Sequence, residues 1–227
     1  MDLAHPADGA ADSVKGAVIT TVGVGPWDVE RPGEQLPSGD QYDPELLSGG
    51  DTRNVADEFR YWSVDAIRAE LDRRREAFRP AELHVAIENW AHDFNIGSVV
   101  RTANAFNAAG VHIVGRRKWN RRGAMVTERY LHVHHHADGA ALAQWASDAG
   151  LTLVGIDNVA GSEPIERFRF PEKAVLLFGQ ESTGLTSDAQ AACSAVVHIT
   201  QHGSTRSLNA GAAGAIAMFA WAQQNLV

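Results

Sequence analysis

The chain has 227 residues, and 44% of them are hydrophobic, which is enough for one domain with a buried core and an extension. The single cysteine, Cys193, excludes an intrachain disulfide framework, which fits a protein of the reducing cytoplasm. We expect Cys193 itself to be a small buried residue. No run reaches the roughly 18 apolar residues of a membrane-spanning helix, and the first residues lack the pattern of a secretory signal.

The acidic charge is concentrated in the N-terminal quarter. Residues 1–58 contain 12 Asp and Glu against 3 Lys and Arg, whereas residues 59–227 contain 16 against 17. The net charge of −8 therefore does not argue against a nucleic-acid partner for the larger part. Residues 1–58 are rich in Gly, Pro, Asp and Ser, which predicts an acidic, largely irregular extension with one short strand at residues 18–24.

Residues 59–83 are predicted to link this extension to the main domain through a helix. Ser63 can cap a helix that runs to about Phe78, because apolar residues recur near helical spacing after it. Three consecutive arginines, residues 73–75, lie on its second half. They form either a solvated face that suits the C-terminal end of a helix or, as the alternative, a contact to RNA.

Short strands and helices alternate from residue 84 to the C-terminus, at residue 227. This alternation predicts an α/β fold with a mostly parallel sheet and helices on both faces. In such sheets ligands bind at the carboxyl ends of the strands, which directs attention to the loops there. The predicted strands are residues 84–88, 111–115, 152–157, 174–179 and 195–200, and the predicted helices are residues 96–108, 138–149, 187–192 and 207–224.

Three of these loops carry unusual residues. In the first, Asn95 can cap the following helix, and Arg101 stands alone among small and apolar helical residues. The second follows an apolar strand and has the sequence Phe-Gly-Gln-Glu-Ser-Thr-Gly-Leu, with glycines that permit a close backbone approach to a ligand. The third leads through Ser207, a predicted helix cap, into a helix packed with Ala and Gly.

The order of these motifs is Asn-x-Gly-x-x-x-Arg, then Phe-Gly-x-Glu-x-x-Gly-Leu, then Gly-x-x-x-Ser-Leu-Asn. It resembles the SpoU (TrmH-like) branch of the SPOUT RNA methyltransferases over residues 84–224. The resemblance implies a deep trefoil knot in the C-terminal part and a homodimer whose active sites draw on both subunits. It also implies S-adenosylmethionine as methyl donor and ribose 2′-O-methylation of tRNA or rRNA as the reaction.

The same resemblance assigns roles to single residues. The donor would be held mainly by backbone groups near Gly179, Ile199 and Leu208, with Ile156 as a weaker candidate. Arg101 would be the catalytic arginine. Because a guanidinium stays protonated, we expect it to stabilise the developing alkoxide and to hold a phosphate, while an RNA phosphate helps to accept the proton. The residues expected to shape the site around it are Asn95, Glu181, Ser207 and Asn209.

The third motif departs from the family pattern. Residues 199–201 read Ile-Thr-Gln where the family often has Ile-Pro-Met, and Ala210-Gly211 follow Ser-Leu-Asn where Val or Leu and Ser are frequent. Both departures fall near the cofactor loop. An RNA-binding protein of the same fold with little or no turnover is therefore the alternative. A nucleotide-dependent oxidoreductase or transferase is disfavoured because the full glycine fingerprint is absent.

Two further segments bear on the partner. Five of the seven residues 116–122 are basic and Trp119 lies among them, which suits phosphate contacts and stacking on an unpaired base, with a solvated loop as the alternative.

The histidine-rich residues 132–136 are interpreted as a surface strand or an RNA-facing patch rather than a metal site, because adjacent strand residues point to opposite faces. The acidic extension would fold over the basic loop or dock on a partner subunit. The predicted RNA contacts are Arg116, Arg117, Lys118, Arg121, Arg122 and Arg206.

Overall fold

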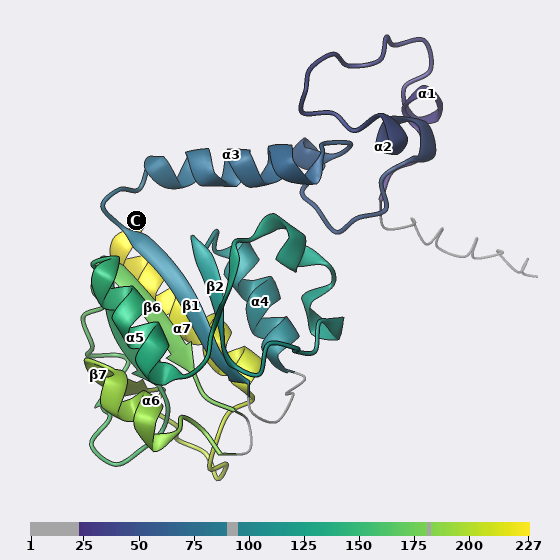
Figure 1. Ribbon diagram of the computed structural model, residues 1–227. Coiled ribbons are helices and arrows are strands. Elements are labelled where there is room, and N and C mark those ends of the chain that lie inside the picture. The colour runs from purple at the N-terminus through teal and green to yellow at the C-terminus, as the bar shows by residue number, and fades with distance from the viewer. Residues whose placement is uncertain (1–22, 90–94, 181–182) are drawn as a thin grey trace, which may run out of the picture.

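The computed structural model describes residues 23–89, 95–180 and 183–227, which form a seven-stranded sheet whose neighbouring strands are all parallel (Figure 1). The strand order is β3-β2-β1-β6-β4-β7-β5. The predicted parallel α/β sheet is confirmed, and its five predicted strands correspond to β1, β2, β4, β6 and β7. The strands are β1 (Glu82–Asn89), β2 (Gly110–Gly115), β3 (Val133–His136), β4 (Thr152–Ile156), β5 (Glu163–Pro164), β6 (Lys173–Phe178) and β7 (Ala195–His198).

Two strands were not among the five predicted. β3 contains most of the histidine run and forms one edge of the sheet beside β2, which agrees with the interpretation as a surface strand. β5 forms the other edge and pairs with β7 over two residues. A strand of that length is too short to produce an alternating pattern in the sequence.

Helices cover both faces of the sheet, as predicted. Along β1, Val85 and Ile87 belong to the core under α4 and α7, whereas Ala86 between them belongs to the core under α5 and α6 (Figure 1). This alternation follows from the two-residue period of a strand. Because both faces are buried, the central strands are nearly continuous apolar runs. These helices are α4 (Asn95–Ala105), α5 (Gly139–Asp148), α6 (Ser187–Ala192) and α7 (Ala210–Asn225).

Two helix boundaries correct the predictions. The helix predicted at residues 96–108 ends at Ala105, because Asn107 adopts a left-handed conformation with φ of 50°. The helix predicted to begin at Ser207 begins at Ala210, and its N-cap is Asn209, whose side chain accepts the backbone N–H groups of two residues in the first turn. The predicted capping role of Ser207 is therefore wrong. Ser and Asn are comparable caps, so local preference did not separate them.

Strand β6 lies between β1 and β4. In the register of the sheet, Phe178 at the end of β6 is opposite Ile87 on one side and Ile156 on the other. The carboxyl ends of three strands therefore coincide, and the loops that follow them meet at one edge of the sheet, where ligands bind in such folds. The trefoil knot stays a prediction.

Residues 23–63 form a small lobe that stands apart from the sheet (Figure 1). Its centre is Asp51, which is fully buried and accepts hydrogen bonds from the Arg53 guanidinium at 2.8 and 2.6 Å and from the Tyr61 N–H at 3.0 Å. Burial raises the pKa of Asp51, but these hydrogen bonds outweigh it and leave the pKa below its usual value. The lobe contains α1 (Trp27–Glu30), α2 (Pro44–Gly49) and the 3₁₀ turn η1 (Asp57–Phe59).

Helix α3 (Val64–Glu76) joins the lobe to the sheet. Ser63 caps it as predicted, accepting the Ala66 N–H at 3.2 Å. Ile67 on α3 packs with Phe59 of the lobe and with Tyr130, which follows β2. The domain boundaries at residues 58 and 83 stay predictions, and the strand predicted at residues 18–24 lies almost wholly outside the described residues.

The three arginines on α3 are paired with polar side chains of the chain itself. Arg73 and Arg74 both donate to Glu70, and Arg75 donates to the side chain of Asn107 at 2.6 Å. These pairs favour the solvated-face interpretation over contact with RNA. None of the described helices is long and apolar enough to cross a membrane.

Candidate cofactor pocket and active site

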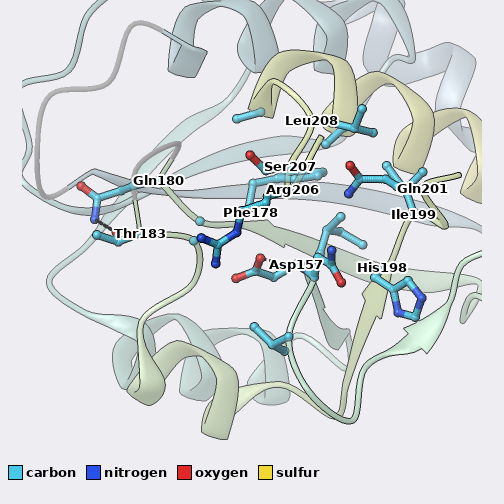
Figure 2. A pocket seen from close by; sticks show the side chains of 17 residues that line it. Asp157, Phe178, Gln180, Thr183, His198, Ile199, Gln201, Arg206, Ser207 and Leu208 are labelled. Carbon is cyan, nitrogen blue, oxygen red and sulfur yellow. Dashed lines mark hydrogen bonds between the residues drawn. The ribbon is translucent and has the colours of Figure 1, made fainter. Parts of the chain in front are cut away.

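A pocket of about 500 Å³ opens at the carboxyl edge of the sheet (Figure 2). Its volume lies within the range of small-molecule sites. It is bounded by the ends of β4, β6 and β7, by the loop after β6, and by the loop that precedes α7. All four residues predicted to bind the cofactor line it, namely Ile156, Gly179, Ile199 and Leu208.

The loop after β6 forms one wall of the pocket through a tight turn. Gln180 and Gly184 exchange backbone hydrogen bonds of 3.1 and 2.8 Å, which folds the chain back on itself. A Cβ atom at Gly179 would collide with the backbone of Gly184, and Gly184 itself adopts φ of +67°. The two glycines of the second motif are therefore required by close backbone packing and by a left-handed conformation. Glu181, predicted to shape the site, lies outside the described residues.

The loop between β7 and α7 forms the opposite wall. Thr200 anchors it, because its hydroxyl donates to Glu166 at 2.9 Å. Arg206 and Ser207 both line the pocket. Figure 2 shows the side chains of Arg206 and Asp157 among those that line the pocket. Arg206, predicted as an RNA contact, thus lies in the pocket wall, apart from the basic residues 116–122.

The first and third motifs meet at the start of α4 and α7. The side-chain N–H of Asn209 donates to Oδ1 of Asn95 at 2.8 Å. Gly211 lies against Ser98 of α4, so close that a Cβ atom there would come within 3.0 Å of it. Arg101 is exposed on α4 and is not among the residues that line the pocket. The structure therefore brings Asn95 and Asn209 together but leaves Arg101 outside the wall of the pocket in a single subunit.

The basic loop after β2 presents its charges to solvent. All five predicted RNA contacts within it are exposed. Trp119, however, is only 6% exposed, and Arg121 lies over its ring at 5.6 Å from the centroid. Stacking of Trp119 on an unpaired base is therefore a wrong prediction, because the indole belongs to the core under α4. Asn89 fixes the loop from below, donating to the carbonyls of Arg116 and Lys118 at 2.6 and 3.0 Å.

The histidines of β3 join a polar cluster on the face under α5. His136 contacts His112 of β2 at 2.9 Å between ring nitrogens, and His112 contacts His84 of β1 at 3.0 Å. Trp145 packs on these rings. Among residues 23–89, 95–180 and 183–227, no group of three His, Cys, Asp or Glu side chains has an arrangement that could hold a metal ion.

Sequence reasoning missed two carboxyl groups at the same edge. Asp157, directly after β4, lines the pocket, and Glu88, at the end of β1, is 1% exposed. Their position at the carboxyl ends of predicted strands, where ligands bind in such sheets, was the signal in the sequence that could have identified them. Cys193 is partly buried, and burial raises the pKa of its thiol to about 12, which disfavours the reactive thiolate.

The chain has relatives whose functions bear on this pocket. Residues 82–219, more than half of the chain, match the SpoU rRNA Methylase family. An uncharacterized tRNA/rRNA methyltransferase of Mycolicibacterium vanbaalenii is 34% identical over 173 residues, which are 73% of this chain and 53% of that protein. The chain therefore spans about half the length of the curated relatives it matches.

Solved structures agree with the family match. The SpoU methyltransferase AviRb from Streptomyces viridochromogenes, in complex with the cofactor AdoMet, is 26% identical with a TM-score of 0.57 over 65% of this chain and 59% of its own. A structure concerned with the 2-OH methylation of C/U34 on tRNA is also 26% identical, with a TM-score of 0.54 over 64% of this chain and 97% of its own. The resemblance inferred from the three motifs is thereby confirmed, and the chain belongs to the SpoU rRNA methylase family.

Proposed function

We propose that this protein transfers the methyl group of S-adenosylmethionine to a ribose 2′-hydroxyl of tRNA or rRNA. The observation that carries the proposal is the pocket at the carboxyl edge of the sheet. It gathers Ile156, Gly179, Ile199 and Leu208, the positions predicted from the family motifs. The relatives support the chemistry, since one is a complex with AdoMet and another concerns 2-OH methylation on tRNA.

The donor fits the residues that line this pocket. Aliphatic side chains and Phe178 supply an apolar wall for adenine, and the turn between Gly179 and Gly184 brings backbone groups close to a ligand. Arg206 supplies a positive charge for the carboxylate of the methionine part. When bound, S-adenosylmethionine provides a methyl group on a positively charged sulfur, open to attack by an oxygen nucleophile.

The protein's own task is to favour the alkoxide form of the ribose hydroxyl. Arg101 suits this task because it is exposed and its guanidinium is a cation with N–H donors and no acceptor. Its guanidinium would stabilise the developing oxygen charge and hold an adjacent phosphate, which then accepts the proton. Asn95 and Asn209 would fix the start of α4 and α7 around it through their 2.8 Å hydrogen bond.

A homodimer would complete this arrangement. Arg101 does not line the pocket of its own subunit, so a pocket and an arginine from different subunits would form one site. Helix α7 packs beside α4, with Gly214 against Val99, and its outer face exposes Ile216 and Phe219. A second copy seated on this apolar face would lie next to Arg101.

RNA would be held by the basic loop after β2. Its five exposed cations lie on one short segment, and contacts of this kind with phosphates supply most sequence-independent affinity. The described residues of the acidic lobe leave these cations exposed. Base recognition would come from other residues, because Trp119 is buried.

Methyl transfer from labelled S-adenosylmethionine to total tRNA and rRNA of a strain that lacks this protein tests the proposal. We expect incorporation by the wild type and a loss of roughly 10²- to 10³-fold for Arg101→Ala, the range seen when a group that stabilises a developing oxyanion is removed. Affinity for the donor should stay unchanged, because Arg101 lies outside the pocket wall.

The matched control is Arg73→Ala, which removes an exposed arginine of α3 that donates to Glu70. It should keep wild-type activity. Full activity of Arg101→Ala would contradict the mechanism. Binding of RNA by the wild type without transfer to either RNA pool would favour the alternative, an RNA-binding protein without turnover.

A further inference from the structure

Two carboxyl groups flank β6 and reach the loop that follows it. Glu88 stands at the end of β1 and Asp157 directly follows β4, and these two strands are the neighbours of β6 on its two sides. Both side chains accept hydrogen bonds from residues 183–186, which we call the anchored segment. This segment closes the turn of the second motif and includes part of the pocket wall.

Glu88 holds the end of the anchored segment. One of its carboxyl oxygens accepts the Thr186 N–H at 2.8 Å, and the other accepts the Thr186 hydroxyl at 2.7 Å. The same hydroxyl accepts the Ala189 N–H at 3.2 Å and so caps α6. A buried carboxyl group adds little stability over an apolar side chain of similar size, so stability alone does not account for Glu88.

Asp157 holds the preceding residue from the other side. Its Oδ2 accepts the Leu185 N–H at 2.7 Å, while its Oδ1 accepts the N–H of Asn158 at 2.7 Å. A Cβ atom at Gly184 would collide with Oδ2, so the contact requires glycine at that position. Two consecutive amides, those of Leu185 and Thr186, are thus bound by two carboxyl groups from different strands.

We propose that Glu88 and Asp157 are positioning residues that hold the anchored segment in the shape that binds the methyl donor. The geometry points to this role because the segment begins where Gln180 and Gly184 close the turn, and the turn carries Gly179 into the pocket. The inference rests on the proposed function of the pocket. Asp157 also lines the pocket, so the competing role is direct attraction of a positive group of the donor, either its sulfonium or its ammonium.

Calorimetric titration of the full chain with S-adenosylmethionine and with S-adenosylhomocysteine separates these roles. The second compound lacks the methyl group and the positive charge on sulfur. Asp157→Ala and Thr186→Val should weaken both compounds about tenfold and to the same extent, the effect of losing an acceptor or donor at one charge-assisted hydrogen bond. Asp157→Asn keeps one acceptor oxygen, which can still accept the Leu185 N–H, and Thr186→Ser keeps the hydroxyl, so both variants should stay within about threefold of wild type.

The control is Asp138→Ala. Asp138 caps α5 by accepting the Ala141 N–H at 2.8 Å, the same kind of bond, and it does not line the pocket. We expect this variant to lower the melting temperature and to leave both affinities unchanged. Circular dichroism at the titration temperature establishes that each variant is folded.

Three outcomes would overturn the proposal. Folded Asp157→Ala and Thr186→Val proteins with lower melting temperatures but wild-type affinities would mean that the carboxyl groups act on stability alone. Asp157→Asn as weak as Asp157→Ala would mean a charge contact to the donor, with the sulfonium if S-adenosylmethionine is affected more and with the shared ammonium if both compounds are affected alike. A wild type that binds neither compound would refute the proposed function of the pocket itself, a result distinct from the other two.

Discussion

A chain of hydrogen bonds crosses the first three strands of the sheet through three histidines. Glu82 contacts Nε2 of His84 at 3.0 Å, His84 contacts His112, and His112 contacts His136. A carboxylate only accepts, so Nε2 of His84 carries the proton at that end. With every ring neutral, His112 must then donate to His84, and His136 must donate to His112. The neutral state therefore has one set of tautomers, and a further proton would disturb the whole chain.

The free energy of unfolding should fall as the pH drops below about 6.5, the ordinary pKa of an unfolded histidine. Burial lowers the pKa of His84 and His136, and burial with the neighbouring histidines lowers that of His112 to about 2. Below pH 6.5 the unfolded chain therefore binds more protons than the folded one. Each such group contributes up to about 1.4 kcal/mol per pH unit between its folded pKa and 6.5. Urea unfolding at pH 7.5 and 5.5 measures this slope.

His112→Phe should lower stability at pH 7.5 and make the slope shallower, because one titrating group is gone. The matched control is His202→Ala, which removes an exposed histidine of the loop before α7 and should keep the wild-type slope. A wild-type free energy of unfolding that is the same at the two pH values would contradict the lowered pKa values of the buried histidines.

At the scale of elements, the first motif fixes how α4 meets the segment after β2. A Cβ atom at Gly97 would lie 2.6 Å from the backbone nitrogen of Ala124 and 2.7 Å from the backbone of Gly123. These residues form the 3₁₀ turn η2 (Arg122–Ala124), which follows the basic loop. The glycine of the motif is therefore required by direct backbone packing, which places the basic loop beside the helix that carries Arg101.

Gly97→Ala should destabilise the protein by about 1–3 kcal/mol, the usual cost of inserting a methyl group into a packed interface. The backbone of η2 would have to move, so activity on RNA should fall as well. Urea unfolding measures the first effect. Gly49→Ala is the control, because a Cβ atom there meets nothing within 4 Å; it should change stability by less than about 1 kcal/mol. Equal stability of the two variants would contradict the packing argument.

The elements were largely predictable, and their order in the sheet was not. The apolar runs of β1, β2, β4, β6 and β7 and the capped helix α3 follow from period and local preference. The position of β6 between β1 and β4 depends on contacts between residues far apart in the chain, which a local pattern does not record. Two departures are local, since Asn107 ends α4 early and Asn209 replaces Ser207 as a cap.

The pocket was predictable through the motifs, but its supporting groups were not. Gly179, Ile199 and Leu208 stand in recognisable sequence patterns and line the pocket together. Glu88 and Asp157 are single acidic residues at strand ends, and their partners lie 98 and 28 residues away. Trp119 was misassigned because an aromatic residue among cations looks the same in sequence whether its ring is buried or exposed.

At the scale of the whole molecule, the outer face of α7 is the feature that a single subunit leaves without a partner among the described residues. Ala212, Ile216 and Phe219 follow helical spacing on one exposed face, whereas Ala217 and Met218 face the core. Ile216 is 40% exposed and Phe219 is 57% exposed. A second copy covering this face would remove both side chains from water in each subunit.

Phe219→Glu should convert a dimer into a monomer, because burial of a side chain of this size contributes about 1.5–3 kcal/mol and a buried unpaired carboxylate opposes association further. In the proposed two-fold dimer each substitution acts twice. Light scattering after gel filtration measures the mass. Methyl transfer should fall with the dimer, while the single-subunit pocket keeps its affinity for the donor. Ala140→Glu, which adds the same charge at an exposed position of α5 on the opposite face of the sheet, should leave the mass unchanged. A monomeric wild type that transfers methyl groups at full rate would contradict a site shared between subunits and would place Arg101 and the pocket in a single chain.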